Sequence, residues 1–253
     1  PRVSAVIFNG FGFLFVFLPL VLAAFFMPGA RWLRPYTLIG GSLIFYAVSG
    51  IEHAVVLCAD VLWVYFVVTR TGFRDSRLML AAAVILPSLA LGYYKYLTFL
   101  LSSLFDLTDP SARDQFSLFA DILVPAGISF FTFQVISFAI DRHRGDIKEI
   151  PSLSHFAAYI MLFPQLVAGP ILRYRDVAVS LRALQEFQLD KEHASRAVGY
   201  ICVGLGVKVL IADTLSHYLA GYGNDPGGLS QLSAVYTIFA YSFQIYFDFY
   251  GYS

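Results

Sequence analysis

The last apolar segment of the chain, residues 233–250, carries polar side chains that fall on one helical face. At about 100° per residue they form a stripe about 80° wide, whose members are Thr237, Tyr241, Gln244, Asp248 and Tyr252. An aspartate in the middle of a membrane helix costs about 2.5–3.5 kcal/mol on insertion scales. Such a stripe therefore faces protein or water, either as a hydrogen-bonded seam between helices or as the wall of a polar cavity. We expect Tyr241, Gln244 and Asp248 to line a cavity.

A second group of polar residues lies towards the end of the apolar segment 118–140. Gln134 and Asp141 share a helical face by their i, i+7 spacing. Asp141 stands beside Arg142 and close to Arg144, which favours a local ion pair for its carboxylate. Gln134 lies deeper in the segment, so it is the better candidate for a cavity.

A third group surrounds residues 163–170, which read Phe-Pro-Gln-Leu-Val-Ala-Gly-Pro. Two prolines and a glycine interrupt helical hydrogen bonding, and the freed backbone groups need protein or water around them. Irregular backbone at membrane depth usually lines a cavity, so Pro164 and Gln165 are cavity candidates. Arg173 and Arg175 follow, and their planar guanidinium groups suit phosphate oxygens. Equally, these arginines can simply mark the cytoplasmic side of the membrane. We keep Arg173 as a candidate for substrate binding.

The sequence offers no familiar catalytic or metal-binding motif. It contains no HExxH, GxSxG, P-loop, dinucleotide-binding or CxxC pattern. Cys58 and Cys202 lie in apolar stretches, which argues against a disulfide or a cysteine-metal site. We therefore expect no metal and no bound cofactor. None of the five histidines falls inside an expected span, and we expect ordinary interfacial roles for His53, His143, His155, His193 and His217.

The composition decides the class of protein that must position these residues. Of 253 residues, 58% are hydrophobic and 13% are charged. With the 19 glycines the apolar share is about two-thirds, against roughly 45–50% in soluble domains. So much apolar surface does not fit in the core of a soluble globule, so the sequence predicts an integral membrane protein whose first partner is the lipid bilayer. Basic and acidic residues balance at 17 each, which gives no indication of nucleic-acid binding.

Eight apolar segments are candidates for membrane insertion, since a crossing helix needs about 20 apolar residues. They are residues 8–27, 36–49, 54–69, 78–94, 118–140, 156–169, 197–215 and 233–250. The sixth has only 14 residues and contains Pro164 and Gln165. This length is more typical of a re-entrant segment than of a crossing.

The charge of the connecting loops sets the expected topology, because basic loops stay in the cytoplasm. Basic residues gather in segments 28–35, 70–77, 141–155 and 170–196, whereas 50–53, 105–117 and 216–232 carry at most one each. Two basic loops in succession lie on the same side only if residues 156–169 enter and leave the membrane there. We therefore expect about seven crossings plus one re-entrant hairpin, with the N-terminus outside.

The expected fold is an all-α integral membrane protein, a multi-span helical bundle with a central polar tunnel, in one membrane domain over residues 1–253. The chain begins at Pro1 without a methionine and stops after an apolar segment, so we expect it to be the N-terminal part of a longer protein. Val177, Leu181 and Leu184 follow helical spacing among arginines. They predict a helix in the membrane interface, with an ordinary solvated linker helix as the alternative.

Three sequence landmarks stand in order along the chain. The first is LVPAGISFFTFQ at 123–134, the second FPQLVAGPI at 163–171, and the third FDFYGYS at 247–253. Together with the opening FLFVFLPL at 13–20, they resemble the membrane-bound O-acyltransferase family, and most closely its bacterial alginate O-acetyltransferase branch. One departure is His143, where that branch usually has an aromatic residue; it concerns a loop detail.

This resemblance implies a function. Family members move an acyl group onto a hydroxyl through a tunnel, and the implied donor is acetyl-CoA or another acyl thioester. The implied acceptor is an exported polysaccharide such as alginate, or an extracytoplasmic acetyltransferase that serves it, at the bacterial inner (cytoplasmic) membrane. The family's essential histidine lies beyond the segment that matches 247–253. No catalytic residue is therefore assigned within the chain, and residues 1–253 alone are expected to be inactive.

Two rival functions remain open at this point. A relative within the same family moves D-alanine onto teichoic acid and shares much of the architecture. A channel or secondary transporter, from a different class, would also contain buried polar residues. It predicts inverted repeats and core-facing charges in several spans, and the sequence indicates neither.

Overall fold

The computed structural model describes residues 10–48, 50–97, 100, 124–166, 169–170, 172–221 and 230–252. Within these ranges all regular structure is helical, which confirms the all-α prediction. The chain divides into two compact units, each described here by itself. Unit 1 comprises Pro1–Val167 and Ile171–Glu186, and unit 2 comprises Ala168–Pro170 and Phe187–Ser253.

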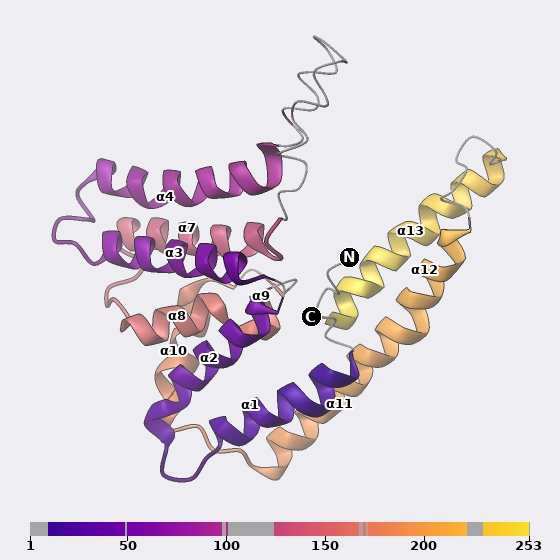
Figure 1. The fold of residues 1–253 in the computed structure, drawn as a ribbon, viewed down its shortest axis with the longest axis horizontal. Helices are drawn as coiled ribbons and strands as arrows, with labels where there is room; N and C mark the ends of the chain where they lie inside the picture. The colour runs from indigo at the N-terminus through magenta and orange to yellow at the C-terminus, as the bar shows by residue number, and fades with distance from the viewer. Residues whose placement is uncertain are drawn as a thin grey trace. The chain divides into compact units, whose positions relative to one another are not determined.

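Unit 1 is a bundle in which α3, α4 and α7 pack side by side and α8 packs against α2 and α3 (Figure 1). Its helices are η1 (Phe13–Phe17), α1 (Leu18–Phe25), η2 (Arg31–Leu33), α2 (Arg34–Ala47), α3 (Ile51–Val68), α4 (Arg77–Leu91), η3 (Gly92–Tyr96), α7 (Ile128–Arg144), α8 (Leu153–Met161), α9 (Phe163–Leu166), α10 (Tyr174–Arg182) and η5 (Ala183–Gln185).

Helix α3 shows how unit 1 builds its core. Leu57, Val61 and Val64 follow the i, i+4, i+7 spacing and are at most 1% exposed. On the opposite face, Leu62 and Phe66 are 53% and 54% exposed. A helix that is apolar on both its inner and outer faces is typical of a membrane span, with lipid against the outer face.

Unit 2 is a pair of long helices. The first runs without interruption through α11 (Lys191–Val207), η6 (Lys208–Ala212) and α12 (Asp213–Ala220), and α13 (Gln231–Tyr252) packs along it. The first helix begins at Asp190, whose Oδ1 accepts a hydrogen bond of 2.7 Å from the backbone N–H of His193. This hydrogen bond lowers the pKa of the exposed Asp190 carboxyl, because it stabilises the ionised form.

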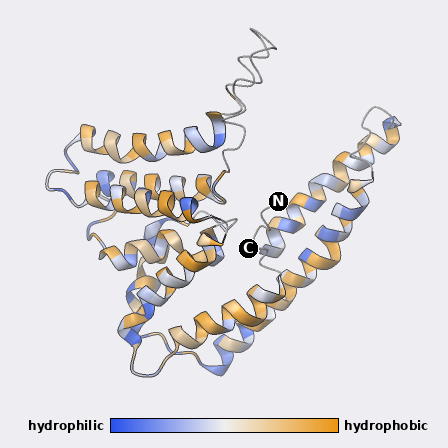
Figure 2. Cartoon of the chain, viewed as in Figure 1, coloured by the Kyte–Doolittle hydropathy of each residue, from blue (hydrophilic) through white to orange (hydrophobic). Residues whose placement is uncertain are grey.

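Three helices are long and apolar enough to cross a membrane among the described residues. They are Ile51–Val68, Arg77–Tyr96 and Lys191–Ala220, and they coincide with three of the predicted spans. Phe13–Phe25 is a shorter apolar helix within the predicted segment 8–27. Figure 2 shows apolar residues (orange) along the surfaces of these helices. The total of seven crossings stays a prediction, and the loops 105–117 and most of 216–232 lie outside the described residues.

The predicted span 118–140 is wrong in its bounds. Helix α7 begins at Ile128, because Gly127 has a left-handed φ of 72° and the residues before it form a turn. The hydroxyl of Tyr46 donates to the carbonyl of Ala126 and fixes this turn to α2. The helix then continues to Arg144, four residues beyond the predicted end. Residues 118–123 lie outside the described part of the chain.

Two histidines lie deeper in helices than the sequence indicated. The turn before α3 is shorter than expected, because Gly50 takes a φ of 143° and the helix starts at the next residue. His53 is therefore in the first turn of a candidate span and is only 2% exposed. His217 lies in α12, since the helix continues to Ala220.

The predicted interfacial helix exists as α10, but its apolar side does not face lipid. Val177 and Leu181 pack against the core of unit 1. The segment after the helix is fixed by Arg34, whose Nη1 donates to the carbonyl oxygens of Leu184 and Gln185 at 3.0 and 3.2 Å. The amphipathic pattern was read correctly as a helix and wrongly as a lipid contact, because protein packing and lipid favour the same pattern.

We expect cysteines at positions 144 and 173 to react with a membrane-impermeant reagent from the cytoplasmic side only. The test uses the full-length protein with Cys58 and Cys202 replaced by serine, and single Arg144→Cys and Arg173→Cys variants. Ser230→Cys, in a loop predicted to be outside, is the control for external labelling. Labelling of position 173 from outside would show that residues 156–169 cross the membrane.

Candidate functional site

The predicted re-entrant segment is an interrupted helix. Helix α8 ends at Met161, Leu162 leaves the helical region with φ −50° and ψ 108°, and α9 resumes at Phe163. The break frees the backbone N–H of Phe163, which donates to Oγ of the fully buried Ser42 on α2 at 3.0 Å. This is the kind of side-chain partner that irregular backbone needs inside an apolar environment.

An aromatic cluster holds the second half of this interrupted helix. The ring of Phe163 lies 5.9, 5.2 and 5.8 Å, centroid to centroid, from the rings of Phe13, Phe17 and Phe45. Phe13 and Phe17 are four residues apart on η1 and present both rings to the same place. Aromatic pairs at these distances stabilise packing beyond their area alone. The opening landmark of the sequence therefore has a structural role in docking α9.

The chain that follows α9 returns to α8. The hydroxyl of Tyr159 donates to the carbonyl of Leu172 at 2.6 Å, and the ring of Tyr159 packs edge-on against Tyr174 with 5.5 Å between centroids. This return supports a hairpin. Of the predicted residues on it, Pro164 is exposed and Gln165 is partly buried.

We expect Ser42→Ala to lower the free energy of unfolding by about 1–3 kcal/mol, because it leaves a buried backbone N–H without an acceptor. Ser88→Ala is the matched control, since Oγ of the exposed Ser88 donates only to the carbonyl of Val84 within its own helix. Thermal unfolding of both full-length variants in detergent measures the difference. Equal midpoints would contradict a structural role for this hydrogen bond.

Several polar groups are buried between α3 and α7. The predicted cavity residue Gln134 is 2% exposed, and Thr132 is fully buried with no hydrogen-bond partner for its Oγ1 among the described residues. Asp60 on α3 is 4% exposed, and its Oδ2 also lacks a partner in that part of the chain. Asp60 was missed from the sequence, and its burial corrects the inference that no core-facing charge occurs in this span.

Asp141 does not form the predicted ion pair. Its side chain is 4% exposed, and no basic group of the described residues lies within ion-pair distance. Its carbonyl instead accepts from the N–H groups of Asp146 and Ile147, at 3.0 and 3.4 Å, where the chain turns after α7. The neighbouring Arg142 points the same way and donates to the carbonyl of Ile147 at 2.8 Å.

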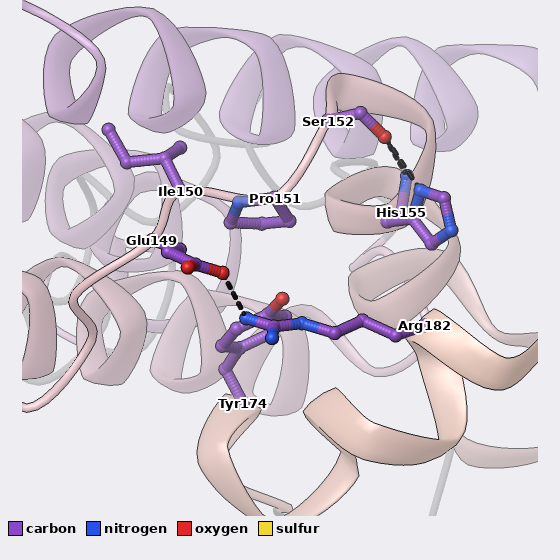
Figure 3. Close-up of a pocket in the computed structure, with 7 residues that line it drawn as sticks. All are labelled: Glu149, Ile150, Pro151, Ser152, His155, Tyr174 and Arg182. Atoms are coloured by element: carbon purple, nitrogen blue, oxygen red, sulfur yellow. Dashed lines mark hydrogen bonds and ion pairs between the residues drawn. The ribbon is translucent and has the colours of Figure 1, made fainter.

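A cleft of about 290 Å³ opens in unit 1 beside the hairpin (Figure 3). Its charged groups are already partnered: Nη2 of Arg182 lies 2.9 Å from Oε2 of Glu149. Oγ of Ser152 lies 2.6 Å from Nδ1 of His155. The full lining is Glu149, Ile150, Pro151, Ser152, His155, Tyr174 and Arg182. The predicted Arg173 is exposed and immediately precedes Tyr174, so it adjoins the cleft without lining it.

Tyr174 gives this cleft a hydroxyl that stays protonated. Burial raises the pKa of Tyr174, and the nearby Arg182 opposes the shift only in part. A neutral phenol can donate a hydrogen bond to an acceptor oxygen in the cleft. The notebook of signals in the sequence contained the arginines here, but not the pairing of Arg182 with Glu149, 33 positions away in the chain.

In unit 2 the stripe on α13 meets a lysine that sequence reasoning missed. Nζ of Lys208 lies 2.7 Å from Oδ1 of Asp213 and 2.8 Å from Oδ1 of Asp248. Gln244 and Asp248 are partly buried, whereas Tyr241 is 57% exposed. A lysine inside an apolar segment is itself a readable signal of a buried polar contact. It is a second charge at membrane depth that the comparison with transporters had overlooked.

Two glycines bring the backbones of unit 2 together next to this lysine. A Cβ added to Gly204 would lie 2.5 Å from the carbonyl oxygen of Gly251, and one added to Gly251 would lie 2.8 Å from the carbonyl oxygen of Gly204. Small residues permit such approaches between membrane helices. The third landmark, 247–253, thus combines the lysine-binding Asp248 with a glycine that admits the neighbouring helix.

A family model, described as MBOAT, membrane-bound O-acyltransferase family, matches residues 42–253 of the chain. The chain belongs to this family. The match confirms the identification made from the landmarks. It also makes the charged contacts of unit 2 those of a membrane-bound O-acyltransferase, so the buried charges found above do not require a transporter.

Curated relatives of this acyltransferase chain act on the cell envelope. It is 35% identical, over 98% of its length, to the probable alginate O-acetylase AlgI of Pseudomonas syringae pv. tomato, covering 48% of that protein. It is 30% identical over 99% of its length to the peptidoglycan O-acetyltransferase of Helicobacter pylori, covering 53%. The teichoic acid D-alanyltransferase of Streptococcus thermophilus is 27% identical over 50% of the chain and 31% of that protein. The chain spans about half the length of the O-acetylating relatives.

Proposed function

We propose that the protein transfers acetyl groups onto a hydroxyl of an exported polysaccharide such as alginate. The observation that carries this proposal is the 35% identity to an alginate O-acetylase over 98% of the chain. The family assignment supplies the reaction class, acyl transfer to oxygen. The polysaccharide is taken from the relatives, and it is the part of the proposal most open to change.

The proposed chemistry explains why polar residues are placed in an apolar bundle. A sugar hydroxyl is a weak nucleophile, so it needs a base close to its proton. The thioester donor must reach the same point while water is kept away, because water would hydrolyse it. A polar tunnel through the bundle meets these requirements. The base is expected to be a histidine C-terminal of Ser253.

The tunnel wall is proposed to include residues from both units. In unit 1 the candidates are the buried Gln134, the helix break at Pro164 and Gln165, and Arg173 at its end. In unit 2 they are Tyr241, Gln244 and Asp248 on α13. The partnered backbone at the break and the Lys208–Asp248 contact support this assignment, because both hold polar groups in defined positions at membrane depth.

The donor and partners follow from the same proposal. We take acetyl-CoA or another acyl thioester as the co-substrate from the cytoplasm, with no bound cofactor. The acceptor is the polysaccharide itself or an extracytoplasmic acetyltransferase that completes the transfer. The protein is placed as a multi-pass protein in the inner membrane. D-alanyl transfer to teichoic acid is the second candidate, supported by the D-alanyltransferase similarity over half of the chain.

The test is acyl transfer by the full-length protein in proteoliposomes with radiolabelled acetyl-CoA inside and alginate, plus its acetyltransferase partner, outside. We expect acetylated alginate, and none from residues 1–253 alone. A parallel reaction with D-alanine, its carrier protein and lipoteichoic acid distinguishes the second candidate. Transfer of D-alanine without transfer of acetyl would reject the acetylation proposal.

A further inference from the structure

Basic side chains gather where the loop after α3 meets the end of α7. The ring of His143 packs on the ring of Phe73 with 5.9 Å between centroids, and its Nδ1 lies 3.2 Å from the Phe73 carbonyl oxygen. Phe73 is 2% exposed, so this loop is fixed to the last turn of α7. The contact places Arg74, the next residue, beside the turn that carries Arg142. The histidine that departs from the family pattern is thus the anchor of this loop.

Arg74 lies against the glycine that ends α7. Gly145 has a left-handed φ of 89°, and a Cβ added to it would collide with Nη2 of Arg74. Only a residue without a side chain leaves room for the guanidinium group there. Among the described residues Arg74 forms no ion pair with a carboxylate, so its charge is not neutralised within that part of the chain.

Arg142 is the second member of this cluster. Its Nη1 donates to the carbonyls of Ile147 and Lys148 at 2.8 and 3.1 Å, which fixes the orientation of the guanidinium group. Its Nε is buried and has no acceptor among the described residues. The pKa of Arg142 is lowered, first by partial burial and then by the positive charge of Arg74. Two adjacent like charges and a buried donor without an acceptor are unfavourable unless an anion accompanies them.

The acidic residues nearby do not supply this anion. The two segments 69–77 and 141–149 contain six basic and four acidic residues. Glu149 is paired with Arg182 at 2.9 Å, and Asp141 is buried without an ion pair to the described basic residues. Asp75 and Asp146 likewise form no ion pair with the arginines described here. The excess positive charge is therefore concentrated on Arg74 and Arg142.

The position of the cluster indicates the source of the anion. One candidate span, Ile51–Val68, ends just before Arg74, and the next, Arg77–Tyr96, begins just after it. Both helices leave the hydrocarbon region here, so the cluster lies at the depth of lipid headgroups. Basic groups at the ends of spans attract anionic lipids, and a guanidinium fork matches phosphate oxygens.

We propose that Arg74 and Arg142 form a binding site for a phosphate group, supplied by the headgroup of an anionic phospholipid. The phosphate oxygens accept from Arg74 and from the free Nε–H of Arg142. Nη1 of Arg142 keeps its carbonyl partners, so the site needs no rearrangement of the turn. The site is independent of the acyl-transfer proposal, since it involves none of the residues assigned to the tunnel.

The test measures lipid binding to the delipidated full-length protein by native mass spectrometry. Phosphatidylglycerol, phosphatidylcholine and inorganic phosphate are titrated separately, and phosphate is also added as a competitor. We expect phosphatidylglycerol to bind at least tenfold more tightly than phosphatidylcholine. Arg74→Gln should weaken phosphatidylglycerol binding about tenfold, because one charge-assisted contact is lost. Arg196→Gln is the control, since Arg196 is an exposed arginine on α11 that pairs with Glu192.

The outcomes separate the site from its source. Unchanged phosphatidylglycerol binding in Arg74→Gln, or an equal loss in Arg196→Gln, would overturn the proposal. Displacement of the lipid by millimolar inorganic phosphate, with loss of phosphate binding in Arg74→Gln, would keep the phosphate site but reject the lipid as its source. Arg142→Lys provides a second check, because it keeps the charge and removes the Nε donor. Arg74 is exposed, so its replacement does not threaten folding.

Discussion

Gly204→Ala and Gly251→Ala should each destabilise the protein strongly, although alanine is the better helix former. In each case the new Cβ would meet backbone atoms of the partner helix at 2.5 or 2.8 Å, closer than van der Waals contact allows. Overpacking of this kind costs about 1–3 kcal/mol or more, and a backbone cannot turn aside as a flexible side chain can. We expect a lower thermal midpoint and a reduced yield of folded full-length protein.

Gly199→Ala is the matched control for this prediction. Gly199 lies on the same helix, and an added Cβ would meet no heavy atom within 4 Å. The substitution should therefore be neutral or stabilise the helix by up to about 1 kcal/mol, the difference in helix propensity. The opposite signs at positions 199 and 204 are the diagnostic result. A stabilising effect at all three positions would show that α11 and α13 do not approach each other as described.

The second large effect is expected at Asp248. Asp248→Asn keeps the shape of the side chain and removes its charge, so it weakens the contact to Lys208 and any contact to substrate. Loss of one charge-assisted hydrogen bond costs about 1.5–3 kcal/mol. If that bond acts in the transition state, polysaccharide acetylation per folded molecule falls about 10- to 100-fold.

Asp213→Asn separates a tunnel role from a purely structural one. Asp213 binds the same lysine at 2.7 Å, but it does not belong to the polar stripe on α13. We expect its replacement to change acetylation only a few-fold. Gln244→Leu should reduce activity with little change in expression, because Gln244 shares the stripe without contacting the lysine. Equal losses in Asp213→Asn and Asp248→Asn would assign the stripe to helix packing.

The apolar segments could be predicted because they depend on composition alone. The spans around Ile51–Val68, Arg77–Tyr96 and Lys191–Ala220 were placed within a few residues, except for extensions of the last at both ends. The interruption at Pro164 was also readable, since proline and glycine act locally. Their effects need no knowledge of what packs against them.

The partners of these elements could not be predicted, because they are distant in sequence. The hydroxyl that satisfies Phe163 belongs to Ser42, 121 positions earlier. The turn at Gly127 that shortens α7 is set by a left-handed φ, and its neighbour Ala126 accepts from Tyr46. Asp60 and Lys208 are different: their charges inside apolar segments were visible in the sequence, and they were overlooked.

The π-helical turn at Lys208–Ala212 explains why one ion pair in unit 2 escapes any search at helical spacing. In an α-helix, residues five apart point about 140° away from each other at 100° per residue. Here the N–H of Asp213 bonds to the carbonyl of Lys208, so the turn contains one residue more than an α-turn, and the two side chains meet at 2.7 Å. The wide turn acts as a built-in single-residue insertion. It sets the rotational phase of α12 relative to α11, so a one-residue deletion within 208–212 would turn every side chain of α12 by about 100°.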